Sequence, residues 1–340
     1  MKALVAHGPG EFRVEDVADP DPGEGAVVEV EAAGVCAADR MIWRGDGPWA
    51  LAFPFVPGHE LLGRVVSVDV ESSRRWGVRA GDRVTAEVMV PCGDCHACVS
   101  GRTNLCRHGT HLGSGIPGAF AEALALPPQA RVHRVPEALP AEAAVLAEPT
   151  ACALHAVRRA ELRAGDVVAV AGIGAIGAAA LGVARGRAGT VVAVANSPAR
   201  AALALELGAD AAVDASGDDA AGVILDLTGG RGVDAFVECS GAADAVRLGL
   251  EALAPGGRLV LYGVYRQPAL VDLNLVAEHK ELDVRGGHLA PDAFPEAIEL
   301  LVGGAVAADR IVTHRHPLHA FGQALGPSPD GSRLKAVLVP

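Results

Sequence analysis

The chain has 340 residues, half of them hydrophobic, which is too long for one comfortable core, so we expect two domains. Its net charge of −12 is spread along the sequence and argues against a nucleic-acid surface or an anionic membrane as partner. The stretch 1–9 has no long apolar run or cleavage signature, and no other stretch reaches the apolar length of a membrane span. Seven cysteines in a chain expected to lack a leader indicate a reducing cytoplasm.

Residues 1 to about 90 have the pattern of β-strands. Apolar and polar residues alternate over 27–32 and in part over 63–70, and 79–85 has the pattern of a turn that leads into another strand. Clusters of Pro and Gly supply the turns between these segments. The pattern predicts a small antiparallel barrel.

Four cysteines then share one short loop at the spacing C-x2-C-x2-C-x7-C: Cys92, Cys95, Cys98 and Cys106. Four thiolates on such a loop can close a tetrahedron around one zinc ion with no open position, so the site holds structure and does no chemistry. The alternatives are disulfides or free core cysteines, but the spacing fits zinc better than a disulfide framework. We therefore predict a structural zinc in a lobe at about 90–110.

Three more residues are candidates to bind a second metal ion. Cys36 and His59 both lie at the ends of apolar segments where loops begin, and loops are where ligands cluster. Taken singly, Cys36 also fits a buried core thiol and His59 a structural histidine. An ionised Glu148 in the apolar run 144–151 needs a partner such as a cation, unless it is a helix-start carboxylate before Pro149.

After about residue 150, apolar strands alternate with helical stretches. The run 164–171 is continuously apolar, as expected of a strand buried on both faces. Further strand patterns occupy 190–195, 233–238 and 257–263, with Gly-bearing turns and helical segments between them. This alternation predicts a parallel, doubly wound sheet.

A G-x-G-x-x-G sequence joins the first of these strands to a helix and comprises Gly172, Gly174, Ile176 and Gly177. That context is the one the dinucleotide-binding motif requires, because glycines let the backbone approach a pyrophosphate and a helix N-terminus favours its charge. The alternative is a Gly-rich turn without a ligand. The motif predicts a bound nicotinamide dinucleotide.

The end of the second strand bears on the choice between NAD and NADP. An acidic residue is expected there to hold the adenine ribose hydroxyls. The sequence instead has Asn196 and Ser197, followed by Arg200, so no carboxylate repels a 2′-phosphate and an arginine is near to attract one. This favours NADP, or use of both cofactors. Alternatively, Asn196 binds the ribose and Arg200 is a solvated helix residue.

Together these motifs resemble the zinc-containing medium-chain alcohol and polyol dehydrogenases. The resemblance covers nearly the whole chain and rests on the Cys36 loop, Gly58-His59-Glu60, the four-cysteine lobe, Glu148-Pro149, the glycine motif and two carboxyl-terminal strands at 312–315 and 335–339. It implies a GroES-like β-rich catalytic domain at 1–148 and 282–340. It also implies a Rossmann coenzyme domain at 149–281.

The resemblance also implies roles for single residues. Cys36, His59 and Glu148 would carry a catalytic zinc, with Glu60 as a neighbour that exchanges with a zinc-bound water. Asp39 would accept a hydrogen bond from the far nitrogen of His59 and fix its tautomer. A glutamate in place of a third catalytic-site cysteine resembles the sorbitol-type branch, which oxidises polyols.

Four further residues are candidates near the reacting groups. Arg315 is a candidate for cofactor binding, and Trp43, Trp49 and His288 are candidates for pocket walls, with ordinary packing as their alternative. The chain departs from the family at Ala38, where relatives usually have the Ser or Thr that passes on the substrate proton.

The expected activity is reversible oxidation of a secondary hydroxyl of a polyol, a cyclitol or a similar alcohol to a ketone, with hydride transfer to NAD(P). We also expect two zinc ions per chain and a homodimer or homotetramer. One alternative is a non-catalytic redox sensor, a zinc-stabilised dinucleotide-binding protein with one zinc per chain. The other is a zinc-independent enone reductase, which would need neither Cys36 nor Glu148.

Overall fold

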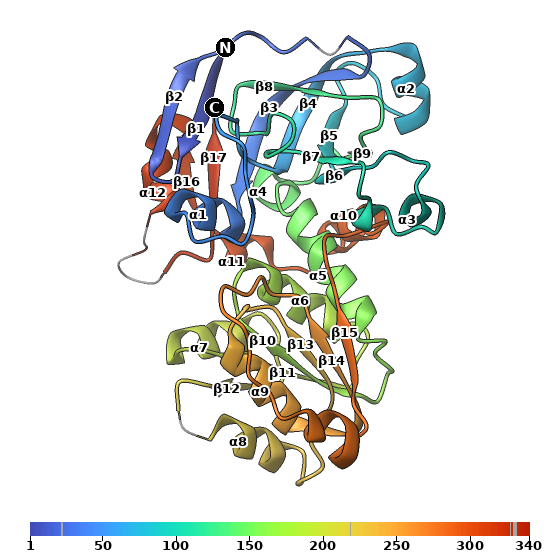
Figure 1. Ribbon diagram of the computed structural model, residues 1–340, viewed down its shortest axis with the longest axis vertical. Helices are drawn as coiled ribbons and strands as arrows, with labels where there is room; N and C mark the ends of the chain where they lie inside the picture. The colour runs from blue at the N-terminus through green and yellow to red at the C-terminus, as the bar shows by residue number, and fades with distance from the viewer. Residues whose placement is uncertain (22, 218, 327, 329–331) are drawn as a thin grey trace. The chain divides into compact units, whose positions relative to one another are not determined.

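The structure is a computed structural model that describes residues 1–21, 23–217, 219–326, 328 and 332–340. It divides the chain into two compact units, drawn in Figure 1. The first comprises Met1–Ala151, Leu289–Val302 and Ala308–Pro340, and the second comprises Cys152–His288 and Gly303–Ala307. The division after residues 148 and 281 stays a sequence-based prediction about the functional domains.

The first unit is mainly antiparallel β-structure. Its strands are β1 (Lys2–Gly8), β2 (Glu11–Asp16), β3 (Ala26–Val35), β4 (Glu60–Val68), β5 (Arg83–Ala86), β6 (Met89–Val90), β7 (Thr110–His111), β8 (Ala123–Leu126), β9 (Val132–Arg134), β16 (Val312–Pro317) and β17 (Lys335–Val339). Within the described residues, one sheet has the order β16-β17-β3-β4-β5-β9, with β8 also paired to β3. The expected β-rich unit is confirmed.

Strand β3 is central to this sheet because it pairs with β4, β8 and β17. The pairing of β17 with β3 sets Leu338 opposite Ala33, so the carboxyl-terminal strand rejoins the first unit as expected. Alternate side chains of β3, such as Val28 and Val30, lie in the core. Both ends of the chain thereby contribute to one hydrophobic core.

The first unit also contains short helices. They are α1 (Ala37–Arg44), α2 (Val70–Trp76), α3 (His96–Val99), α4 (Ala141–Ala144), α10 (Phe294–Val302), α11 (Ala308–Ile311), α12 (Phe321–Leu325) and the 3-10 turns η1 (Thr103–Leu105) and η3 (Leu318–Ala320). Helix α2 shows why such helices begin where they do. Asp69 caps it, and its carboxylate accepts bonds from the backbone N–H groups of Glu71 and Ser72.

The second unit has a parallel sheet. Its strands are β10 (Val167–Ala171), β11 (Thr190–Ala195), β12 (Ala211–Asp214), β13 (Val233–Glu238), β14 (Leu253–Leu261) and β15 (Asp283–Gly286). As far as the chain is described, these six strands are all parallel, in the order β12-β11-β10-β13-β14-β15. The order reverses between β10 and β13, which is the topological switch point where such sheets bind dinucleotides.

Helices connect these strands. They are α5 (Ala147–Arg159), which begins in the first unit, then α6 (Ala175–Arg185), α7 (Pro198–Glu206), α8 (Ala220–Leu227), α9 (Ala243–Ala252) and the π-helical turn η2 (Leu275–His279). The Rossmann-type fold predicted from the strand–helix alternation is confirmed. None of the helices in the described part of the chain is both long and apolar enough to cross a bilayer.

Candidate zinc centres and dinucleotide site

The four-cysteine lobe brings its sulfur atoms into one cluster. Neighbouring Sγ atoms of Cys92, Cys95, Cys98 and Cys106 lie 3.4–3.9 Å apart. With zinc–sulfur bonds of about 2.3 Å, a tetrahedral site needs sulfurs about 3.8 Å apart, so the cluster fits one zinc ion. None of the four cysteines forms a disulfide, so their sulfur atoms are available to bind a metal ion.

The backbone of the lobe favours the charged form of one of these sulfurs. The N–H of Cys92 donates to Cys106 Sγ over 3.4 Å. This bond lowers the pKa of Cys106 to about 6, which makes the thiolate, the form that binds metal, more accessible.

A second group of metal-binding side chains lies at the carboxyl end of β3 and the start of β4. One ligand atom each from Cys36, His59 and Glu60 lies within 4.8 Å of the others. Cys36 directly precedes α1, and His59 and Glu60 lie where a loop runs into β4. The cross-strand partner of Glu60 is Gly34, whose missing side chain leaves room, since a Cβ there would lie 1.9 Å from Glu60 Oε2.

Asp39 holds the loop that carries Cys36. Its carboxylate accepts a hydrogen bond of 2.8 Å from the backbone N–H of Cys36 and is almost fully buried. Its other oxygen lies 3.9 Å from His59 Nδ1, an ion-pair distance that is too long for a hydrogen bond. The expected bond from His59 to Asp39 is therefore a charge contact in this structure.

The charges around His59 are mostly negative. Burial by itself lowers the pKa of His59, but a hydrogen bond with Cys36 and the charges of Asp39, Cys36 and Glu148 raise it well above the usual value. Several anionic groups thus converge on His59. A thiolate, an imidazole and a carboxylate are also the donor types that zinc prefers, so these residues fit a zinc ion.

Glu148 is buried in the first turn of α5, and its charge helps to raise the pKa of both His59 and Lys335. It is not one of the three residues grouped within 4.8 Å. It lines a small cavity of about 10 Å³ with Glu87, Asn104 and Leu289 among others, which is close to the space of one water molecule. The role of Glu148 as a metal ligand stays a prediction.

Sequence reasoning missed Lys335, the direct partner of Glu60. Its Nζ lies 2.5 and 2.7 Å from the two carboxylate oxygens of Glu60, and both side chains are buried. The available signal was a single lysine that opens the apolar strand 335–339. A buried lysine requires an anionic partner, and the sequence does not say which.

The glycine motif joins β10 to α6. Gly172 has φ of +88°, a conformation that side chains rarely adopt, and a Cβ on Gly177 would lie 2.1 Å from the carbonyl oxygen of Gly172. Gly174 precedes the first turn of α6, where unpaired N–H groups point outward. These features build the close turn and helix start that a pyrophosphate requires.

Asn196 and Ser197 follow β11, and Arg200 lies in the first turn of α7. Asn196 is exposed, and Ser197 caps α7 by accepting from the backbone N–H of Arg200. The described end of β11 is therefore Ala195 followed by an amide rather than a carboxylate. Arg315 lies on β16, where its guanidinium pairs with Glu142 at 2.9 Å.

The candidate pocket walls have ordinary contacts. The ring of Trp43 packs edge-on against Phe12 and Phe321, with centroids 5.0 and 5.9 Å away. Trp49 and His288 are exposed. These contacts account for Trp43 as packing, and a role for any of the three in a pocket stays a prediction.

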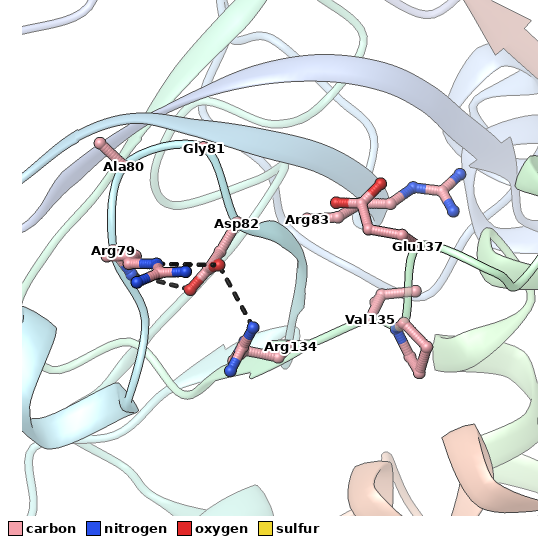
Figure 2. Close-up of a pocket in the computed structure, with 9 residues that line it drawn as sticks. Arg79, Ala80, Gly81, Asp82, Arg83, Arg134, Val135 and Glu137 are labelled. Atoms are coloured by element: carbon pink, nitrogen blue, oxygen red, sulfur yellow. Dashed lines mark hydrogen bonds and ion pairs between the residues drawn. The ribbon is translucent and has the colours of Figure 1, made fainter.

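A cavity of about 590 Å³ lies beside β5 and β9. Figure 2 shows residues that line it, among them Arg79, Asp82 and Arg134. Asp82 pairs with both arginines, at 3.8 Å to Arg79 and 3.3 Å to Arg134. None of the residues predicted from the sequence to bind metal, cofactor or substrate lines this cavity.

Comparisons with known proteins agree with this arrangement. Residues 22–137 match the alcohol dehydrogenase GroES-like domain, and residues 175–303 match the zinc-binding dehydrogenase family. An erythritol/L-threitol dehydrogenase of Mycolicibacterium smegmatis is 40% identical over 100% of this chain and 98% of its own length. A sorbitol dehydrogenase of Halalkalibacterium halodurans is 34% identical over 100% and 99%.

A solved structure gives the same result for the fold. A putative zinc-binding dehydrogenase from Sinorhizobium meliloti, bound to NADP, is 30% identical, covers 100% of this chain and 99% of its own, and has a TM-score of 0.90. The chain belongs to the zinc-binding medium-chain dehydrogenase family. It is a zinc-dependent, NAD(P)-linked alcohol or polyol dehydrogenase.

Proposed function

We propose that this enzyme reversibly oxidises a secondary hydroxyl of a small polyol, such as a four-carbon sugar alcohol, to a ketone. The relative named for erythritol and threitol, at 40% identity over the full chain, supports a short polyol more than a simple alcohol. The observation that carries the proposal is the grouping of Cys36, His59 and Glu60 within 4.8 Å. A zinc-independent reductase would not need that group, and a sensor would not need a second metal site.

For the zinc ligands we propose Cys36, His59 and Glu148, with Glu60 as a neighbouring carboxylate that exchanges with a zinc-bound water. An oxygen of Glu60 also lies within 4.8 Å of both Cys36 and His59, but Lys335 already bonds the two oxygens of that carboxylate. Glu148 is buried, its charge raises the pKa of His59, and it is the carboxylate that the family resemblance implies. A zinc ion held by these residues would act as a Lewis acid and lower the pKa of a bound hydroxyl.

The neighbouring residues position these ligands. The carboxylate of Asp39 fixes the Cys36 loop by accepting a hydrogen bond from the backbone N–H of Cys36. The charge of Asp39 also favours a fixed orientation of His59. Lys335 holds the carboxylate of Glu60 by two bonds. Because Ala38 has no hydroxyl, the substrate proton leaves by another path, through a water to Glu60 or another group, or through a second hydroxyl of the polyol itself.

For the cofactor we propose Gly172, Gly174, Ile176 and Gly177 as the pyrophosphate site, with Asn196, Ser197 and Arg200 at the adenine ribose. The absence of a carboxylate after β11 supports NADP over NAD. Arg315, Trp43, Trp49 and His288 remain proposed contacts of cofactor or substrate. We further propose that the enzyme is cytoplasmic, in keeping with its free thiols. We also propose that it forms a homodimer or homotetramer.

The test is turnover of the purified, zinc-loaded enzyme on a panel of polyols, cyclitols and simple alcohols, each with NAD and NADP. We expect the highest kcat/KM for a short polyol, with preference for NADP. Faster turnover of a simple primary alcohol than of every polyol would contradict the proposed substrate class.

A further inference from the structure

A buried carboxylate lies at the switch point of the parallel sheet, and neither the zinc site nor the glycine motif uses it. Glu238 is the last residue of β13 and has no exposed surface. Strand β13 pairs in parallel with β10, so its carboxyl end lies at the same edge of the sheet as Gly172, where doubly wound sheets bind dinucleotides. A charge without exposed surface requires several donors.

The carboxylate of Glu238 accepts bonds from two different loops. Within 239–242, it accepts from the backbone N–H of Ser240 at 2.6 Å, from the Ser240 hydroxyl, and from the N–H of Gly241 at 3.0 Å. The carboxylate also accepts a hydrogen bond of 2.5 Å from the hydroxyl of Tyr265, in the segment after β14. Burial and the charge of Glu238 raise the pKa of Tyr265, so that hydroxyl stays protonated and donates.

These loops also pack closely on one another and on the glycine motif. A Cβ on Gly263 would lie 2.1 Å from the backbone nitrogen of Gly241, and a Cβ on Gly172 would lie 2.7 Å from that of Ser240. The N–H of Cys239 donates to the carbonyl of Ala171 at 2.8 Å. Loops after β10, β13 and β14 thus form one packed edge, with the carboxylate of Glu238 joining the last two.

In a doubly wound sheet, the half that begins with the glycine motif binds the adenosine side and the pyrophosphate, and the other half receives the second mononucleotide. We propose that Glu238 is a positioning residue for the nicotinamide half of the dinucleotide: it fixes 239–242 and 262–265 as the crevice wall on the β13 side. This inference rests on the proposed NAD(P) site and extends it to residues outside the glycine motif.

The experiment measures dissociation constants of NADPH, NADH and ADP for the zinc-loaded enzyme, by fluorescence titration and, for ADP, by competition. We expect Glu238→Gln, whose amide presents donors where the loops also donate, to weaken both dinucleotides on the order of tenfold. ADP lacks the nicotinamide half, so its affinity should change less than about threefold. Tyr265→Phe removes a single donor and should give a smaller change in the same direction.

Asp234→Asn is a matched control because Asp234 lies at the opposite end of the same strand, where it accepts the N–H of Val167 at 2.8 Å. It should leave all three dissociation constants unchanged even where it lowers the melting temperature. Wild-type dinucleotide affinity for both Glu238→Gln and Tyr265→Phe would overturn the inference, as would equal weakening of ADP. If the wild-type enzyme binds no dinucleotide, the proposed cofactor site itself is wrong.

Discussion

Lys335 Nζ and the carboxylate of Glu60 form a buried ion pair between strands that lie 275 positions apart in the sequence, at 2.5 and 2.7 Å. Their side chains are only 4% and 1% exposed. The same ammonium donates to the carbonyl of Val35 at 3.1 Å, next to Cys36. Lys335, the first residue of β17, therefore holds in place a carboxylate that lies beside the proposed zinc ligands Cys36 and His59.

Removing the lysine should leave a buried carboxylate without its main partner. We expect Lys335→Met to lower the free energy of unfolding by about 3–5 kcal/mol, the range for breaking a buried pair. Urea denaturation of the purified enzyme measures this. Lys2→Met, which breaks an exposed pair with Asp16, is the control and should change stability little. A loss for Lys335→Met no larger than for Lys2→Met would show that Glu60 does not depend on Lys335.

Two carboxylates compete for the third position in the proposed zinc site. We expect Glu148→Gln to lose the catalytic zinc and Glu60→Gln to retain it, because Lys335 already bonds both oxygens of Glu60. Metal analysis of both variants after gel filtration measures the difference. Loss of zinc from Glu60→Gln alone would instead assign Glu60 as the third ligand.

The four-cysteine lobe should depend on its metal. We expect Cys95→Ser to reduce the zinc content by one ion per chain and to open the segment 92–106 to proteolysis, because the lobe has little regular structure of its own. Limited proteolysis with mass spectrometry locates the cuts. Cys239→Ala removes a thiol outside the lobe and should keep the full zinc content. An intact lobe in the zinc-depleted variant would refute a structural role for the metal.

Cofactor preference should follow the residue after β11. We expect Asn196→Asp to lower kcat/KM for NADP relative to NAD by about tenfold or more, because a carboxylate there repels a 2′-phosphate and binds ribose hydroxyls. Arg200→Ala should shift the same ratio in the same direction. The measurement is the ratio of kcat/KM for the two cofactors at one saturating substrate concentration. An unchanged ratio in both variants would mean that other residues select the cofactor.

His155 gives the second unit a defined dependence on pH. Burial, together with the charges of Arg159 and Arg158, lowers the pKa of His155 to about 4. The unfolded chain takes up this proton near pH 6.5 and the folded chain only near 4, so the unfolded state binds more protons in between. Stability from this group is therefore fully present above about pH 6.5 and is lost as pH falls toward 4.

We expect His155→Phe to reduce the fall in unfolding free energy between pH 7 and pH 5 by about 1 kcal/mol, after allowing for partial exposure. The ring of Tyr262, 6.4 Å from that of His155, should accommodate the aromatic replacement. The comparison is between the two denaturation curves at each pH, which cancels contributions common to both proteins. Parallel loss of stability in variant and wild type would contradict the assignment to His155.

Much of the fold could be predicted from the sequence because its signals are local. Alternation predicted β3, continuous apolar runs predicted β10 and β11, and the cysteine spacing predicted the sulfur cluster of the lobe. The pair Lys335–Glu60 and the grouping of Glu60 with Cys36 and His59 depend on strand pairing between distant segments. No local pattern specifies such pairing, so the choice between Glu60 and Glu148 could not be made from the sequence.

The most direct test of a second, catalytic zinc is metal content and turnover of Cys36→Ser beside the wild-type enzyme. We expect two zinc ions per wild-type chain, and one in Cys36→Ser with turnover of every polyol abolished and the lobe intact to proteolysis. One zinc ion in the wild-type chain, or two zinc ions and full turnover in Cys36→Ser, would contradict the account.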